Sequence, residues 1–181
     1  LTALEVIGFG EAPPSGIEIL TGAGAILGDD KRIRFPRALV EDMLKKAARG
    51  ITLHARDEKQ DLHLEPSRVH YGTAGAAVYV VDSEKREYRE STVQDLYDAG
   101  RIVDHLDNVH FYQRCMVCRD IPDNFEMDMN TLYACCAATT KHVGVSFTSP
   151  DYIPHALEML HMIAGGEEQW RARPFVSNSN C

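Results

Sequence analysis

Helical and strand patterns alternate in the second half of the sequence, and this alternation restricts the fold more than any other feature. The helix patterns repeat apolar side chains every three to four residues, whereas the strand patterns are short and rich in aromatic and β-branched residues. The expected order is a helix over 91–106, a strand over 108–118, a helix over 126–140, a strand over 142–147, a helix over 149–166 and a strand over 173–178. Helices between consecutive strands predict a parallel sheet, in either a Rossmann-like or a barrel arrangement.

The first ninety residues mix helices with short strands. A helix pattern over 36–49 begins at Pro36, which suits a first helical turn, and Gly50 follows its last turn. From residue 51 to residue 90 the apolar residues alternate with polar ones, which predicts short strands joined by turns. This part of the chain is therefore expected to have an α+β character.

The composition excludes several classes of partner. Its 27 acidic and 19 basic residues give a formal net charge of −8, which does not suit a phosphate backbone. We therefore expect neither nucleic acid nor an anionic membrane as a partner. No stretch approaches the roughly 20 apolar residues of a membrane span. The five cysteines lack the spacing of a disulfide framework, which indicates a reducing compartment, the cytoplasm.

Both ends of the sequence have the pattern of interrupted elements. The chain starts without Met, inside a short apolar helix pattern, and it ends directly after the last strand pattern. Nothing that follows the last strand could pack over it. We therefore expect the sequence to be a fragment of a longer chain.

Residues 70–82 have the sequence HYGTAGAAVYVVD, a small-residue stretch followed by an apolar run. The stretch is not G-x-G-x-x-G and lacks the G-K-[ST] ending of a P-loop. It lies between two predicted strands, whereas a phosphate loop lies between a strand and a helix, which disfavours a nucleotide site. Two explanations stay open: a tight turn between strands, or small residues that leave room for a ligand beside His70, Tyr71 and Tyr79.

The cysteines and histidines do not predict a metal site. Cys115 and Cys118 form a C-x-x-C pair, but a zinc site needs a second pair at suitable spacing. The pair ends a strand instead of opening a helix, which favours buried structural thiols over a redox pair. The histidines include no H-x-H or H-x-x-x-H spacing, and no G-x-S-x-G motif is present.

Polar residues follow three of the predicted strands, at 114–119, 146–149 and 177–180. In a βα barrel the chemistry gathers where the strands run into the following loops. Asn178, directly after an apolar strand, is typical of a hydrogen-bonding residue in such a place. Ordinary loop polarity explains any one of these residues equally well.

Several short motifs, taken in order, resemble one enzyme family. They are an ALEV helix end, RIRFPRALVEDML, TLHARD, the small-residue YGTAGA, the run STVQDLYDAGRIVDHLDNVHFYQRC, and TTKHVG at a strand entry. In this order and at this spacing they are similar to the trimethylamine methyltransferase family, and more narrowly to its non-pyrrolysine branch related to glycine betaine methyltransferase. The resemblance covers essentially the whole chain.

The resemblance implies a fold. Members of the family have a (β/α)8 TIM-type barrel after an N-terminal segment. We therefore expect a mixed helix and short-strand segment over residues 1–90 and the first βα units of an apparently truncated barrel over residues 91–181. The position of pyrrolysine in true trimethylamine enzymes would lie beyond Cys181.

The resemblance also implies a function. Such enzymes transfer a methyl group from a methylated tertiary or quaternary amine, such as trimethylamine or glycine betaine, to the Co(I) corrinoid of a partner protein. The chain itself would bind no metal or cofactor, and its partners would be the corrinoid protein and the small amine, with a homo-oligomer as a further possible assembly. An alternative on the same fold is a non-catalytic protein that binds a methylated amine for regulation.

The implied chemistry suggests candidate site residues. A quaternary ammonium has no N–H donor and is bound best by aromatic faces, whereas the carboxylate of a betaine needs hydrogen-bond donors. Core packing is the competing explanation for each aromatic residue, and no catalytic residue can be assigned. The candidate cage residues are Tyr71, Tyr79, Phe111 and Tyr112. The candidate polar contacts are His70, Arg114 and Asn178.

Overall fold

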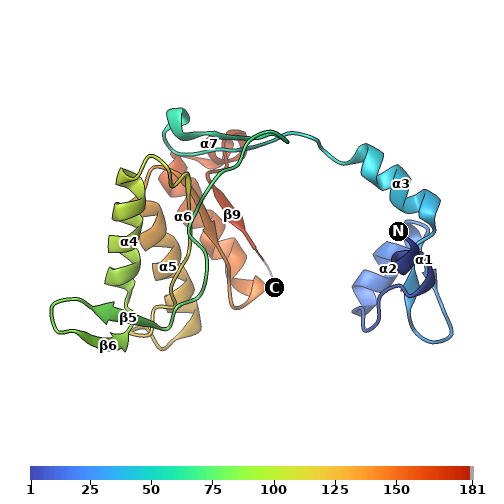
Figure 1. The fold of residues 1–181 in the computed structure, drawn as a ribbon, viewed down its shortest axis with the longest axis horizontal. Helices are drawn as coiled ribbons and strands as arrows, with labels where there is room; N and C mark the ends of the chain where they lie inside the picture. Colours follow the sequence, from blue (N-terminus) through green and yellow to red (C-terminus); the bar gives the residue numbers. More distant parts are fainter. Residues whose placement is uncertain (180–181) are drawn as a thin grey trace. The chain divides into compact units, whose positions relative to one another are not determined.

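The computed structural model describes residues 1–179 and forms two compact units, residues 1–49 and the chain from Gly50 onward (Figure 1). The domain boundary expected after residue 90 remains a prediction. Within the described part of the chain, no helix is long and apolar enough to cross a membrane.

The first unit packs short helices against a two-stranded antiparallel hairpin. Its elements are α1 (Thr2–Val6), α2 (Pro14–Gly22), β1 (Ile26–Leu27), β2 (Ile33–Arg34) and α3 (Arg37–Lys46). Ile33 is fully buried in this unit. α3 follows Pro36 as predicted, but it ends before Gly50 is reached, because Ala47 already has an extended backbone.

The second unit combines antiparallel hairpins with a parallel sheet and helices. Its elements are β3 (Ile51–Leu53), η1 (Glu58–Gln60), β4 (Leu62–Leu64), β5 (Tyr79–Asp82), β6 (Glu87–Glu90), α4 (Val93–His105), β7 (Phe111–Gln113), α5 (Asn124–Ala138), β8 (His142–Val145), η2 (Pro150–Tyr152), α6 (Ile153–Ala164), α7 (Glu167–Ala172) and β9 (Val176–Asn178). β3 pairs with β4 and β5 with β6, both antiparallel. The mixed α/β class and the parallel sheet are thus confirmed.

The parallel sheet has the strand order β7-β8-β9, which is also the order of these strands in the sequence. Tyr112 lies opposite Val143, and both side chains are buried in the core formed with α4, α5 and α6. A doubly wound fold reverses its strand order and has helices on both faces. Three consecutive strands with their helices on one face occur both in βα barrels and within one half of a doubly wound sheet.

Residues 70–77, which we call the edge segment, run alongside β7. Gly72 forms a parallel bridge with Phe111 and Ala77 forms one with Met116, and the two bridges belong to one register. The edge segment thus lies beside β7, where a further parallel strand would lie. In the sequence it comes before α4. The expectation of a tight turn between two strands is wrong, because this backbone is extended along β7.

The edge segment is not a complete strand, because its main-chain hydrogen bonds to the β7 chain lie at its two ends. His110 N donates to Tyr71 O (2.7 Å), and Val117 N donates to Ala77 O (2.9 Å). Between them Gly75 has a φ of +117°, a conformation that favours glycine and that interrupts the extended backbone. The small residues of this segment therefore allow a break in an otherwise extended strand.

A buried lysine fixes the entrance to the sheet. The ammonium of Lys141, directly before β8, donates to Val103 O (2.7 Å), Leu106 O (2.8 Å) and Val109 O (2.7 Å). These carbonyls belong to the last turn of α4 and to the connection from α4 to β7. Burial lowers the pKa of Lys141, and the three carbonyls match the three donors of a charged ammonium.

α4 and α5 approach each other closely at Gly100. A β-carbon at this position would lie 2.5 Å from the β-carbon of Ala138 and 2.9 Å from the ring of Tyr112. Tyr112 is fully buried, and its hydroxyl donates to Leu96 O of α4 at 2.5 Å. The glycine that interrupts the helical pattern is therefore required by packing.

We expect Gly100→Ala to destabilise the second unit. The added methyl group would overpack the contact with Ala138 and Tyr112, which costs about 1–3 kcal/mol. This exceeds the about 0.5–1 kcal/mol that alanine gains over glycine inside a helix. The measurement is the free energy of unfolding in urea.

The matched control is Gly50→Ala, because no atom lies within 4 Å of a β-carbon built there. This variant should unfold at the wild-type urea concentration. A Gly100→Ala protein as stable as wild type would contradict the packing explanation.

Candidate functional site

The parallel sheet has one face that α4, α5 and α6 do not cover, which we call the inner face. Side chains alternate between the two faces of a strand, and Tyr112 and Val143 point into the helical core. The neighbouring residues therefore point to the inner face. They are Phe111 and Gln113 of β7, His142 and Gly144 of β8, and Ser177 of β9.

Gly144 lies between Gln113 and Ser177 in the register of the three strands. The carboxamide of Gln113 occupies the space where a side chain of Gly144 would be, and its oxygen lies nearest to that point. This carboxamide has no hydrogen-bond partner among residues 1–179. In the same way, the ring of Phe111 lies over Gly72 of the edge segment.

A hydrogen bond orients the hydroxyl of Ser177. The Nδ1 atom of His142 lies 2.7 Å from His54 O, and a carbonyl only accepts, so Nδ1 carries the proton. Burial lowers the pKa of His142 below its ordinary value of 6.5, so the ring is neutral at pH 7. Its Nε2, 3.0 Å from Ser177 Oγ, then accepts from the hydroxyl and leaves the serine lone pairs facing outward.

The β3–β4 hairpin fixes His142 in this state. His54 extends from the end of β3, and its Nδ1 lies 3.0 Å from Asp61 Oδ2. Asp61 also accepts from Arg173, which precedes β9, at 2.8 Å and 2.9 Å. The β3–β4 hairpin is thus bonded to the start of β8 through His142 and to the residues before β9 through Arg173.

The arrangement is suited to binding. A serine and a histidine at 3.0 Å are also the first two members of a nucleophilic triad. Here, however, the histidine donates to a backbone carbonyl where a triad has a carboxylate. No group of histidine, cysteine or acidic side chains in the described part of the chain could hold a metal ion. The inner face therefore offers oriented oxygen atoms and an aromatic ring to a ligand.

The seven predicted site residues do not form one cluster. His70 and Tyr71 lie near the amino end of β7, beside His110. The Tyr71 N–H donates to His110 Nδ1 (2.9 Å), and the His70 and His110 rings are 5.2 Å apart. Arg114 and Asn178 lie at the opposite, carboxyl ends of β7 and β9. Whether any of the seven contacts a ligand stays a prediction.

The predicted aromatic cage is divided in the same way. Phe111 is on the inner face, whereas the side chain of Tyr79 is exposed on the β5–β6 hairpin. Tyr112 is fully buried in the core, where burial raises the pKa of its hydroxyl. Core packing, the competing explanation, accounts for the position of Tyr112, and its contact with a ligand stays a prediction.

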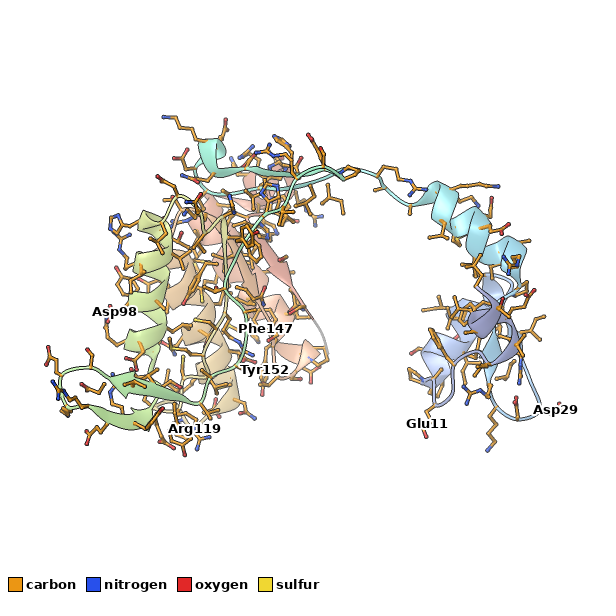
Figure 2. The ribbon with its side chains drawn as sticks, in the orientation of Figure 1. Glu11, Asp29, Asp98, Arg119, Phe147 and Tyr152 are labelled. Atoms are coloured by element: carbon orange, nitrogen blue, oxygen red, sulfur yellow. The ribbon has the colours of Figure 1, made fainter. Side chains whose placement is uncertain are left out.

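The β5–β6 hairpin is anchored at the carboxyl end of the sheet. Arg89 forms two hydrogen bonds of 2.7 Å to Asp95, which with Thr92 makes the capping box that begins α4. Arg119, labelled in Figure 2, forms a further ion pair with Glu90 of β6 (3.0 Å). The hairpin is therefore held against α4 and the loop that follows β7.

Gln113 and His142 were not predicted as site residues, and Ser177 was predicted only as part of the polar stretch 177–180. Gln113 and Phe111 are two apart, so the alternation along β7 could have grouped them on one face. The pairing of His142 with Ser177 joins residues 35 positions apart, and no sequence pattern indicates it. Residue 180, part of the polar stretch predicted after the last strand, lies outside the described residues.

Comparisons with known proteins point to one family. The sequence model of the trimethylamine methyltransferase family matches residues 1–180. The trimethylamine methyltransferase MttB of Desulfitobacterium hafniense (strain DSM 10664 / DCB-2) is 29% identical over 100% of this chain and 36% of the relative. The glycine betaine methyltransferase of Desulfitobacterium hafniense (strain Y51) is 24% identical over 96% of this chain and 36% of the relative.

A relative from another organism extends the comparison. The trimethylamine methyltransferase MttB1 of Methanosarcina mazei is 24% identical over 82% of this chain and 31% of the relative. The chain thus spans about a third of the length of the curated relatives that it matches.

We expect His142 to make the free energy of unfolding depend on pH. Its pKa in the folded protein lies below the ordinary value of 6.5, so the unfolded chain binds the proton more tightly. Stability is therefore complete above pH 6.5 and falls as the pH decreases from there toward the folded pKa. Urea unfolding between pH 8 and pH 5 measures this dependence.

Replacing His142 by Asn removes the titrating ring, so this variant should lose less stability across the interval than wild type. His155→Asn is the control, because its ring is exposed on α6, and this variant should keep the wild-type dependence. An unchanged dependence in His142→Asn would refute the assignment.

Proposed function

The chain belongs to the trimethylamine methyltransferase family, and from this premise we propose that the protein takes a methyl group from a small methylated amine. The observation that carries the proposal is the family match over residues 1–180. The named relatives act on trimethylamine and on glycine betaine, and we propose an amine of this type as the substrate. The acceptor that we propose is the Co(I) corrinoid of a partner protein, so that the chain itself binds no cofactor.

The fold supports this proposal through its strand order. We propose that the edge segment, β7, β8 and β9 are the beginning of a (β/α)8 barrel whose further strands would add beside β9. The consecutive order of the strands and the helices on one face are what such a barrel requires. The inner face would then line the barrel interior, and Arg114 and Asn178 would lie at its carboxyl end, where barrel enzymes bind substrate.

The chemistry asks mainly for positioning. The corrinoid would supply the nucleophile, so the residues of this chain need to hold the N–CH3 bond in line and keep water away. A neutral His142, an oriented Ser177 hydroxyl and the ring of Phe111 contribute no acid or nucleophile, and such chemistry does not need one. The described cysteines are free thiols, which supports the cytoplasmic location that we propose.

We expect the whole protein to demethylate trimethylamine or glycine betaine when Co(I) cobalamin is supplied. The measurements are the visible spectrum of the cobalamin, which changes on methylation, and the appearance of dimethylamine or dimethylglycine. Glycine, which has no methyl group to give, is the matched control substrate and should leave the spectrum unchanged.

The proposal would be refuted if the protein transferred no methyl group from either amine, with free cobalamin or with a corrinoid protein as acceptor. If calorimetry then detected binding of either amine without turnover, the alternative of a non-catalytic methylated-amine binding protein would replace it.

A further inference from the structure

We propose that Gln113 and Ser177 hold the methylated nitrogen of the substrate between them, over Gly144. This inference rests on the proposed function and names the side chains that contact the reacting group. Three features carry it: the register of the strands, the acceptor character of the two side chains and the neighbouring ring of Phe111.

The register gives Gln113 and Ser177 a fixed separation. They lie in one row, on strands that flank β8, with Gly144 between them. Neighbouring strands are about 4.8 Å apart, so the two Cα atoms are separated by roughly 10 Å. Because Gly144 has no side chain, the carboxamide of Gln113 lies in the place that such a side chain would occupy.

Both side chains present oxygen acceptors to this space. The Ser177 hydroxyl donates to His142, so its lone pairs are the part that remains for a ligand. The oxygen of the Gln113 carboxamide lies nearest to Gly144, and within the described chain no donor satisfies it. Interiors of βα barrels are normally filled with branched apolar side chains, so a carboxamide in this row is an unusual side chain for packing alone.

A methylated ammonium can contact both oxygen acceptors and the ring of Phe111. Its nitrogen has no N–H donor when quaternary, and its positive charge is spread over the methyl C–H groups. These groups interact with oxygen acceptors through weak C–H···O contacts and with aromatic faces through cation–π attraction. A carboxylate or phosphate in the same place could be bound only through the NH2 group of Gln113, because the Ser177 hydroxyl already donates to His142.

Phe111 supplies the aromatic face. It precedes Gln113 by two residues on the same strand, so both side chains point to the inner face. Its ring lies over Gly72, just as the carboxamide lies over Gly144. A cation between Gln113 and Ser177 would therefore have the ring one layer away, toward the amino end of β7.

Calorimetry with the whole protein and three probes tests the proposal. Glycine betaine carries both charges, tetramethylammonium carries only the cation, and 3,3-dimethylbutanoate replaces the nitrogen of betaine by carbon. In Gln113→Met, which keeps the length of the side chain, we expect about tenfold weaker binding of the two cationic probes. Binding of 3,3-dimethylbutanoate should not weaken, because that probe has no positive charge to lose.

Gln113→Glu gives the sharper test, because the affinities for the cationic probes and for 3,3-dimethylbutanoate should change in opposite directions. A carboxylate beside the cation should strengthen binding of tetramethylammonium and betaine and weaken binding of 3,3-dimethylbutanoate. Ser177→Ala should weaken the binding of the cationic probes, as Gln113→Met does. The controls are Gln94→Met on the exposed face of α4 and Ser83→Ala in the turn between β5 and β6, which should bind as wild type does.

Three outcomes would overturn the proposal. Unchanged binding of the cationic probes in Gln113→Met and Ser177→Ala, with unfolding midpoints like that of wild type, would remove both residues from the site. Weaker betaine binding in Gln113→Glu would place the carboxylate of the substrate beside Gln113. If wild type bound no cationic probe and transferred no methyl group, the proposed function itself would fail, whereas the first two outcomes leave it intact.

Discussion

The second unit depends on one buried charge. The ammonium of Lys141, directly before β8, joins the last turn of α4 to the connection into β7 through three carbonyls. Two of these carbonyls also accept a backbone N–H, Val103 O from Leu106 and Leu106 O from Val109, so the ammonium binds to a turn that already has its own hydrogen bonds. Asp104 continues the same junction, because it accepts from Thr139 Oγ1 and Thr140 N, both at 2.8 Å.

From this junction, β7 organises the packing on both faces of the sheet. Each of its three side chains is accommodated by a glycine on a different neighbour. Tyr112 packs beside Gly100 of α4, the Phe111 ring lies over Gly72, and the carboxamide of Gln113 lies over Gly144. A large residue on β7 is thus matched by the absence of a side chain next to it. This matching leaves the inner face open beside Gln113, where the candidate site is.

The sequence pattern predicts the elements well and the site poorly, for a physical reason. The alternation of helix and strand periods from residue 91 onward is local, and so is the cap of α4 at Thr92. Which face of β7 meets the helices is decided by tertiary packing, so Tyr112 and Gln113 could not be distinguished by residue type. The tight turn predicted for the edge segment was wrong because small residues suit either a turn or an interrupted strand. The sequence of this segment combines strand spacing with a glycine of positive φ, Gly75.

The bonding of the edge segment at its two ends has a consequence for motion. Its amides near Gly75 lack the continuous ladder that a complete strand would have, so hydrogen–deuterium exchange there needs only a local opening. Ala77 and Val117, whose amides are bonded, would exchange only when the end of the segment separates from the β7 chain. The segment that passes beside Phe111 is therefore held at its two ends by main-chain bonds and between them by the Thr73 hydroxyl, which donates to Gln113 O (2.6 Å).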